Sequence, residues 1–116
     1  MTTPEGKVKS RVRDLLARYQ GMYSYWPVPS GYGRTTIDVI GCYRGRFFAI
    51  EVKAGNKKPT LKQAEELKNM GLAMGMTFKV NDQGGLEEIE QWLDKLTEEI
   101  GDYPRVPRDE VRRRKI

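Results

Sequence analysis

Two acids and a lysine, Asp38, Glu51 and Lys53, are the residues of this chain best placed to do chemistry. The sequence from residue 35 to 53 is rich in β-branched and aromatic residues, with Gly45 near its centre. This pattern predicts strands at 35–43 and 46–53, joined by a two-residue turn. In that register the numbers of cross-strand partners add up to 89, so Asp38 lies opposite Glu51. Opposed residues share a face of the sheet, and Lys53, two residues beyond Glu51, shares it too.

This pair of acids predicts a metal site. Like charges opposed across two strands destabilise a sheet, and a divalent cation between them reverses that effect. Mg²⁺, for which Mn²⁺ would substitute, suits a site of one or two carboxylates completed by water. Lys53 would then lie in reach of a metal-bound water or a phosphate oxygen. The alternative is a surface strand with a Glu-Lys pair and a solvated Asp38. The metal site also depends on the turn length, because a turn one residue longer would separate the two acids.

The composition excludes several other kinds of active site. The chain has 116 residues, no His and a single Cys, which excludes an internal disulfide framework, the usual zinc sites and a Ser-His-Asp triad. No apolar run approaches the roughly 20 residues of a membrane span, and the N-terminus has no signal-peptide pattern. We expect one domain over residues 1–100, a basic tail over 101–116, and a cytoplasmic location with no membrane contact.

The charge is unevenly distributed and favours a nucleic acid as a partner. The net charge is +5, but residues 86–100 carry −5, so the rest of the chain carries +10. A basic surface of this kind is typical of nucleic-acid binding, with ordinary solubility charge as the alternative. The candidate phosphate contacts are Ser30, Gly31, Tyr32, Gly33 and Arg34 in a Pro- and Gly-rich loop, Lys57 and Lys58 after the hairpin, and Arg11 in the first helix. The Arg-rich end of the tail could bind phosphates as well.

A first helix is expected over residues 3–20. Thr3 suits the N-cap, Pro4 the first helical position, and Gly21 the stop. Its apolar stripe is Val8, Val12, Leu15, Leu16 and Tyr19. Glu5 lies three residues before this stripe begins, so it either points inward toward the hairpin acids or stabilises the helix dipole.

Two more helices and a strand follow the hairpin. A helix is expected over 60–70, stopped by Gly71, with Thr60 and Gln63 forming a capping box. The cap explains Gln63 structurally, and the functional reading is contact with a phosphate or an active-site water. Its buried side is predicted to be Leu61, Ala64 and Leu67. A strand at 76–81 predicts a right-handed parallel crossover, and a helix at 86–100 packs through Leu86, Ile89, Trp92, Leu93, Leu96 and Ile100.

The chain has a motif that resembles the PD-(D/E)xK nuclease superfamily. It consists of I-D, then twelve residues, then E-V-K, and then a Gln at the start of the next helix. Within this superfamily the chain is most similar to the VRR-NUC domain of compact phage proteins. The resemblance covers about Glu5 to Val80 and includes the G-Y-G-R segment before Asp38. The chain lacks the Pro-Asp pair of the superfamily name, as VRR-NUC members commonly do. The fold implied is α/β, a restriction-endonuclease-like core with a mixed β-sheet and a central hairpin flanked by helices.

The resemblance implies a metal-dependent DNA endonuclease, selective for branched, flap or nicked DNA, that leaves a 5′-phosphate and a 3′-hydroxyl. Asp38, Glu51 and the Val52 carbonyl would bind Mg²⁺ or Mn²⁺, and Glu5 would complete the site. Lys53 would position or deprotonate the attacking water, with Gln63 near the phosphate. Stand-alone members resemble Holliday-junction resolvases in forming homodimers. The alternatives are a catalytically silent nucleic-acid-binding module of the same fold, and a structural or protein-interaction domain.

Overall fold

Over the described residues the protein is an α/β domain with one four-stranded mixed sheet and three helices. Its structure, a computed structural model, describes residues 3–27 and 37–101. The sheet order is β1-β2-β3-β4, with β3 and β4 parallel and the other neighbours antiparallel. In chain order the elements are α1 (Pro4–Ala17), β1 (Tyr23–Tyr25), β2 (Val39–Tyr43), β3 (Arg46–Val52), α2 (Leu61–Leu72), β4 (Met76–Val80) and α3 (Leu86–Ile100).

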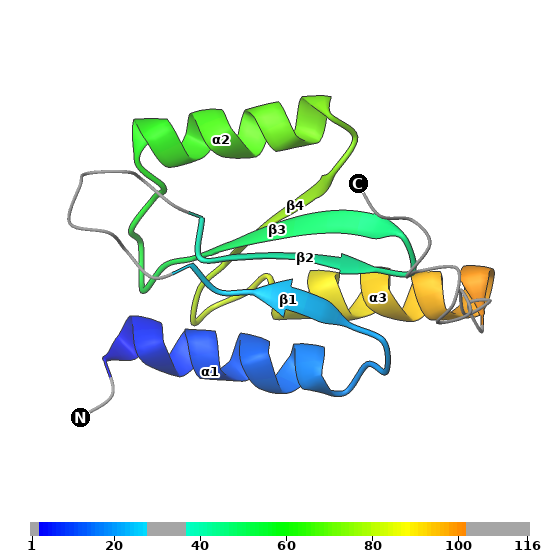
Figure 1. The fold of residues 1–116 in the computed structure, drawn as a ribbon. Coiled ribbons are helices and arrows are strands. Elements are labelled where there is room, and N and C mark those ends of the chain that lie inside the picture. Colours follow the sequence, from blue (N-terminus) through cyan, green and yellow to red (C-terminus); the bar gives the residue numbers. More distant parts are fainter. Residues whose placement is uncertain (1–2, 28–36, 102–116) are drawn as a thin grey trace.

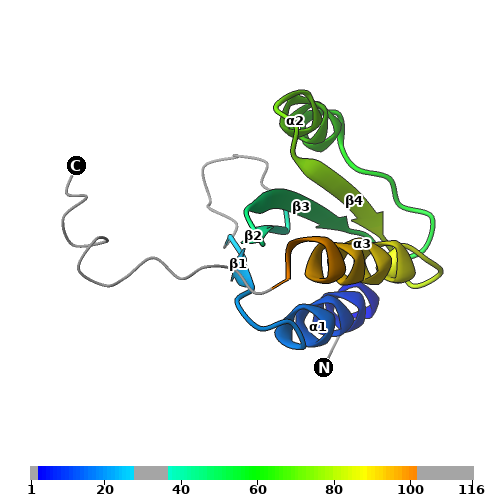
Figure 2. The ribbon, with the colours of Figure 1, turned by 90° about the vertical axis from the view of Figure 1, so that its right-hand side faces the viewer.

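The helices lie on both faces of the sheet. α1 and α3 lie side by side beneath it, and α2 lies alone above it (Figure 1). The view turned by 90° shows α2 over the side of the sheet where β4 lies, while β1 forms the opposite edge (Figure 2). Among the described residues, a helix therefore covers only part of the upper face of the sheet.

The hairpin has the predicted register. Tyr43 pairs with Arg46 and Val39 with Ile50, so partner numbers add up to 89 throughout the ladder. The turn residues Arg44 and Gly45 both have positive φ, 50° and 79°, as a two-residue hairpin loop of the primed type requires.

The two predicted hairpin strands are shorter in the structure. β2 begins at Val39, so the register ends one pair before Asp38 and Glu51, and β3 ends at Val52 rather than at residue 53. Residues 35 and 36 of the predicted first strand lie outside the described residues.

The main hydrophobic core lies between the sheet and the α1–α3 pair. Alternate residues of the strands point into it, including Val39 and Tyr43 of β2 and Phe48 and Ile50 of β3. The predicted stripe of α1 is buried there through Val8, Val12, Leu15 and Leu16, with Tyr19 half-buried against it. α3 has the predicted bounds, and Ile89, Leu93 and Leu96 are buried, with Leu86, Trp92 and Ile100 partly so.

The predicted buried side of α2 is wrong for two of its three residues. Leu61 is 90% exposed and Ala64 is exposed as well. The helix instead turns Gln63, Leu67 and Met70 toward the sheet, a spacing of four and three residues along one helical face. The physical reason is the Gln63 side chain, which the capping box holds at the first turn and which donates to Glu51 of β3, so that this face of the helix turns toward the sheet.

Three predicted element ends also shift. α1 ends at Ala17, three residues before the predicted end, and α2 continues through Gly71 to Leu72. β4 ends at Val80, and the β3–α2–β4 connection is parallel as expected. Among residues 3–27 and 37–101, no helix combines the length and the hydropathy needed to cross a bilayer.

Candidate functional site

Asp38 lies where the β2–β3 ladder stops, and its side chain accepts the next hydrogen bond from β3. The Val52 backbone N–H donates to Asp38 Oδ2 at 2.7 Å. A side-chain carboxylate thus accepts the bond that a backbone carbonyl would otherwise accept. The contact holds Asp38 against the end of β3, where the predicted E-V-K segment lies. The Asp38 side chain is 16% exposed, so the carboxylate keeps some contact with solvent.

Glu51 is buried almost completely, with 1% of its surface exposed. Its Oε1 accepts a hydrogen bond from Gln63 Nε2 at 3.0 Å and lies 3.5 Å from Lys53 Nζ. Its Oε2 is buried without a hydrogen-bond partner within the described residues. A buried carboxylate oxygen without a donor is costly, because it has lost water and gained nothing in return.

The two acids are close enough to perturb each other. The pKa of Glu51 is raised to about 8, chiefly by burial, and the neighbouring Asp38 carboxyl contributes to this rise. Lys53 acts in the opposite direction and lowers that pKa. The site therefore resists two negative charges at neutral pH, and a cation bound between the carboxylates would remove that resistance.

The Val52 carbonyl faces the same side as Asp38. The next backbone N–H, that of Lys53, donates to the Val80 carbonyl of β4 at 2.9 Å. No peptide bond is cis among the described residues, and the C=O and N–H of a trans peptide point in opposite directions. The Val52 oxygen therefore points away from β4, toward the β2 side where Asp38 lies.

Gln63 reaches Glu51 because the α2 cap holds it. Thr60 Oγ1 accepts from the Gln63 N–H at 3.2 Å, and Gln63 Oε1 accepts from the Thr60 N–H at 2.9 Å. With Oε1 engaged in the cap, the amide Nε2 is left to donate to Glu51. The predicted cap is confirmed, and contact of Gln63 with a phosphate or a water stays a prediction.

Glu5 approaches the site through a lysine. Glu5 Oε2 lies 3.7 Å from Lys9 Nζ, one helical turn further along α1, and the same Nζ lies 3.1 Å from Asp38 Oδ1. Sequence reasoning missed Lys9 as a site residue. The available signal was its spacing of four from Glu5, but a helix sequence does not show which strand the helix will face.

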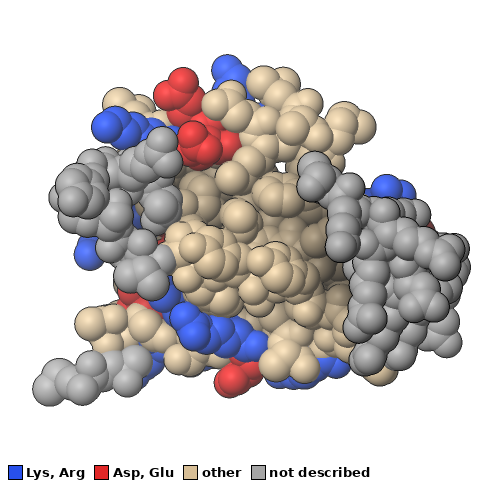
Figure 3. Space-filling model, in the orientation of Figure 1, with Lys and Arg blue, Asp and Glu red and all other residues tan. Residues whose placement is uncertain are grey.

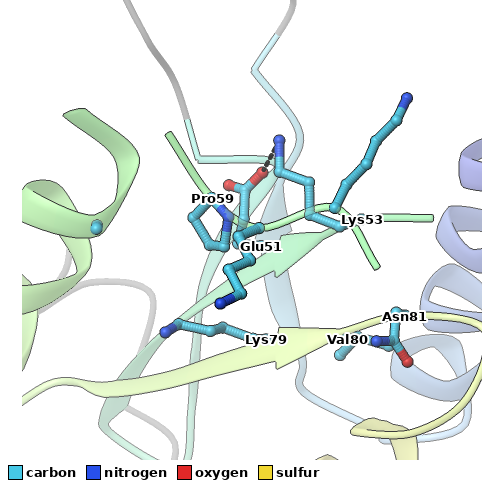
Figure 4. A pocket seen from close by; sticks show the side chains of 9 residues that line it. Glu51, Lys53, Pro59, Lys79, Val80 and Asn81 are labelled. Atoms are coloured by element: carbon cyan, nitrogen blue, oxygen red, sulfur yellow. Dashed lines mark ion pairs between the residues drawn. The ribbon is translucent and has the colours of Figure 1, made fainter. Parts of the chain in front are cut away.

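A cavity of about 500 Å³ opens beside Glu51 and is lined by several lysines. Lys53 bends back over Glu51, and Lys79 of β4 lies on the same side of the sheet (Figure 4). Glu51 and Lys79 are direct partners in the parallel β3–β4 register. The predicted phosphate contacts Lys57 and Lys58 line the same cavity. Lys79 is a further site residue that the sequence alone did not indicate.

Other predicted contacts lie elsewhere. Ser30, Gly31, Tyr32, Gly33 and Arg34 fall outside the described residues, as does the tail beyond Gly101. Arg11 is exposed and lines a separate cavity of about 440 Å³, together with the turn before α3. The two cavities share Val80 and Asn81 in their walls, so Arg11 lies next to the lysine cavity rather than within it.

The chemistry available at the site is that of two carboxylates, a backbone carbonyl and an amine. No group of three or more His, Cys, Asp or Glu side chains suited to a metal occurs among residues 3–27 and 37–101. A hard cation such as Mg²⁺ commonly binds one or two carboxylates and keeps several waters. The orphaned Glu51 Oε2, the adjacent Asp38 and the inward Val52 carbonyl fit such a cation.

Comparison with known proteins assigns no family. The sequence matches no protein-family model, and it matches no curated protein.

Proposed function

We propose that this protein is a metal-dependent DNA endonuclease with a restriction-endonuclease-like core, similar to the VRR-NUC domain. The observation that carries the proposal is Glu51, a buried acid with an oxygen that lacks a donor among the described residues, next to a second acid. The order of the motif along the fold supports it as well. Asp38 precedes β2, Glu51 and Val52 end β3 with Lys53 directly after it, and Gln63 lies in the first turn of α2.

The side chains of the chain itself hold and prepare the site. Asp38, Glu51 and the Val52 carbonyl would hold Mg²⁺ or Mn²⁺, which supplies a nucleophilic hydroxide from bound water and neutralises charge on the phosphate. Gln63 holds Glu51 Oε1 and so aims the carboxylate. Lys53, paired to Glu51, places an ammonium at the cavity wall, where it can orient a water or a phosphate oxygen.

The lysine cavity supports a polyanionic substrate. Lys53, Lys57, Lys58 and Lys79 line it with Glu51 as its acid, and of the four only Lys53 has a carboxylate partner among the described residues. Several ammonium groups around one cavity, most of them without a carboxylate partner, attract phosphates. A nucleic-acid strand passing over the cavity would bring one phosphate to Glu51 and Lys53 and its neighbour toward Lys79.

The test is cleavage of a panel of single-stranded, duplex, flap, nicked and four-way DNA with Mg²⁺ and with Mn²⁺. We expect metal-dependent products with 5′-phosphate ends from at least one branched or nicked substrate. Asp38→Asn should abolish cleavage and retain the fold, because the amide oxygen still accepts from the Val52 N–H. The matched control is Asp14→Asn, at an exposed acid of α1.

Two results would contradict the proposal. One is the absence of any metal-dependent cleavage across the panel. The other is undiminished cleavage by the Asp38→Asn variant. Salt-sensitive DNA binding without cleavage would instead support the catalytically silent binding module.

A further inference from the structure

The ammonium of Lys9 lies next to Asp38, one of the two acids proposed to bind the metal. Its Nζ lies 3.1 Å from Asp38 Oδ1, and the other oxygen of that carboxylate accepts from the Val52 N–H. Both Asp38 oxygens are therefore engaged, one by Lys9 and one by the Val52 N–H. A divalent cation that binds Oδ1 must approach a positive charge already in hydrogen-bond contact with that oxygen.

Each of the two acids forms an ion pair with a different lysine. Lys9 pairs with Asp38 and Lys53 pairs with Glu51, each from a different element. Lys53 extends from the end of β3 and lines the lysine cavity. Lys9 extends from α1 and is not among the residues that line that cavity. It therefore has no corresponding contact with the region where we place the substrate.

Glu5 is a second ion-pair partner for Lys9. Its carboxylate lies 3.7 Å from Lys9 Nζ, and residues spaced by four on a helix form ion pairs without any change of backbone. The Lys9 side chain is 33% exposed and the Glu5 side chain 37%. The ammonium therefore has both the room and a partner to leave Asp38 while staying paired on α1.

We propose that Lys9 is a built-in counterion that competes with the metal for Asp38 and is transferred to Glu5 when the metal binds. This inference rests on the proposed function, since it requires the Asp38–Glu51 pair to be a metal site. In the metal-free protein Lys9 stabilises the acids and ties α1 to the start of β2. Because Lys9 competes for Asp38, it lowers the affinity of the protein for the metal. Glu5 acts on metal binding through Lys9 and is not itself a ligand.

The test is titration of Mn²⁺ into the full-length protein, followed by calorimetry, together with urea unfolding in EDTA. For Lys9→Met we expect Mn²⁺ to bind at least about fivefold more tightly, the lower end of usual coupling between two sites. The same variant should be less stable than wild type in EDTA, because Asp38 loses its cation. Lys7→Met, at an exposed lysine of the same helix, makes the same change in net charge and should alter neither quantity.

A double-mutant cycle tests the role of Glu5. If Glu5 acts through Lys9, Glu5→Gln weakens Mn²⁺ binding in the wild-type background and has no effect in the Lys9→Met background. Equal weakening in both backgrounds would make Glu5 a ligand and overturn this part of the inference.

The outcomes separate this inference from the proposed function. A wild-type protein that binds no Mn²⁺ would overturn the metal site itself. A wild-type protein that binds Mn²⁺ while Lys9→Met binds no more tightly would leave the metal site intact and overturn the competition. A purely structural Lys9 would show in the same way, as lower stability with unchanged affinity.

Discussion

The two faces of the sheet bury different kinds of groups. The face toward α1 and α3 encloses a continuous apolar core of fourteen buried residues, whereas the face toward α2 encloses three, Ile37, Ala49 and Leu67. The two buried polar side chains of the described residues, Glu51 and Gln63, belong to the α2 side. Apolar burial stabilises a fold, while a buried acid with an oxygen lacking a donor destabilises it. One face therefore maintains the fold, and the other buries polar groups at a cost in stability.

The surface shows the same division. In the view of Figure 3 a broad uncharged area lies between the charged side chains at its margin. Exposed apolar residues of the upper face and its rim include Tyr23, Tyr25 and Phe47, with Leu72 and Met74 at the end of α2. The α2 side is thus less completely packed as well as more polar, which agrees with the site that we propose there.

The largest expected effect on stability is on the α1–α3 side. Leu93→Ala removes a fully buried side chain from the large core and should lower the free energy of unfolding by about 3–5 kcal/mol. Leu67→Ala, in the three-residue cluster, should cost about 2 kcal/mol because fewer neighbours lose contacts. Urea unfolding of both variants checks the difference. Equal losses, or a larger loss at Leu67, would contradict the division between the two faces.

The next effect is a pH dependence that originates on the α2 side. The pKa of Glu51 is raised from 4.5 to about 8, chiefly by burial, so the folded protein binds this proton more tightly than the unfolded chain. The contribution is fully present below pH 4.5 and is lost as pH rises to 8. We expect the free energy of unfolding in EDTA to fall by up to about 1.4 kcal/mol per pH unit across this range.

Glu51→Gln should remove this slope and make the metal-free protein more stable than wild type at pH 8. Saturating Mg²⁺ should flatten the slope in wild type alone, because the cation stabilises ionised Glu51. Glu65→Gln, at an exposed acid of α2, should leave the slope unchanged. An identical pH profile for wild type and Glu51→Gln would show that Glu51 is not perturbed.

A smaller effect is expected at the cap that joins α2 to the site. Thr60→Ala removes the hydroxyl that accepts from the Gln63 N–H and should lower stability by about 1 kcal/mol. The same change loosens the first turn of α2, although the Thr60 backbone N–H still holds Gln63 Oε1. The contact of Gln63 with Glu51 should therefore become weaker, and Mn²⁺ binding with it. Thr60→Ser keeps the hydroxyl and should restore both. Loss of stability with unchanged metal affinity would separate the cap from the site.

The smallest effect is expected at Leu61. Although it is a leucine at the first turn of a helix, it is 90% exposed. Leu61→Gln should change the free energy of unfolding by less than about 0.5 kcal/mol. A loss of 2 kcal/mol in urea unfolding would mean that Leu61 is buried in solution and that α2 is rotated from the position described.

The hairpin and its acids could be predicted from the sequence because a two-residue turn with Gly45 allows a single register. That register places Asp38 and Glu51 at the same level without further information. The capping box likewise followed from the spacing of Thr60 and Gln63. These features depend on residues close together in the sequence, where turn and cap geometry decide the structure.

The rest of the site depends on how distant elements pack. Lys79 faces the cavity because β4 pairs in parallel with β3, and no tight turn fixes the register of a parallel pair. Lys9 meets Asp38 because α1 docks beneath the start of β2. The misassigned face of α2 has the same origin, since apolar spacing alone placed Leu61 inward, whereas the contact of Gln63 with Glu51 turned it outward.

The central claim is that Asp38 and Glu51 together hold a divalent cation, and calorimetric titration of Mn²⁺ at pH 8 tests it most directly. The account predicts saturable binding to the wild-type protein at up to millimolar Mn²⁺, and its loss in both Asp38→Asn and Glu51→Gln, with Glu65→Gln binding as wild type. Absence of binding to wild type, or equal binding to Glu51→Gln, would contradict it.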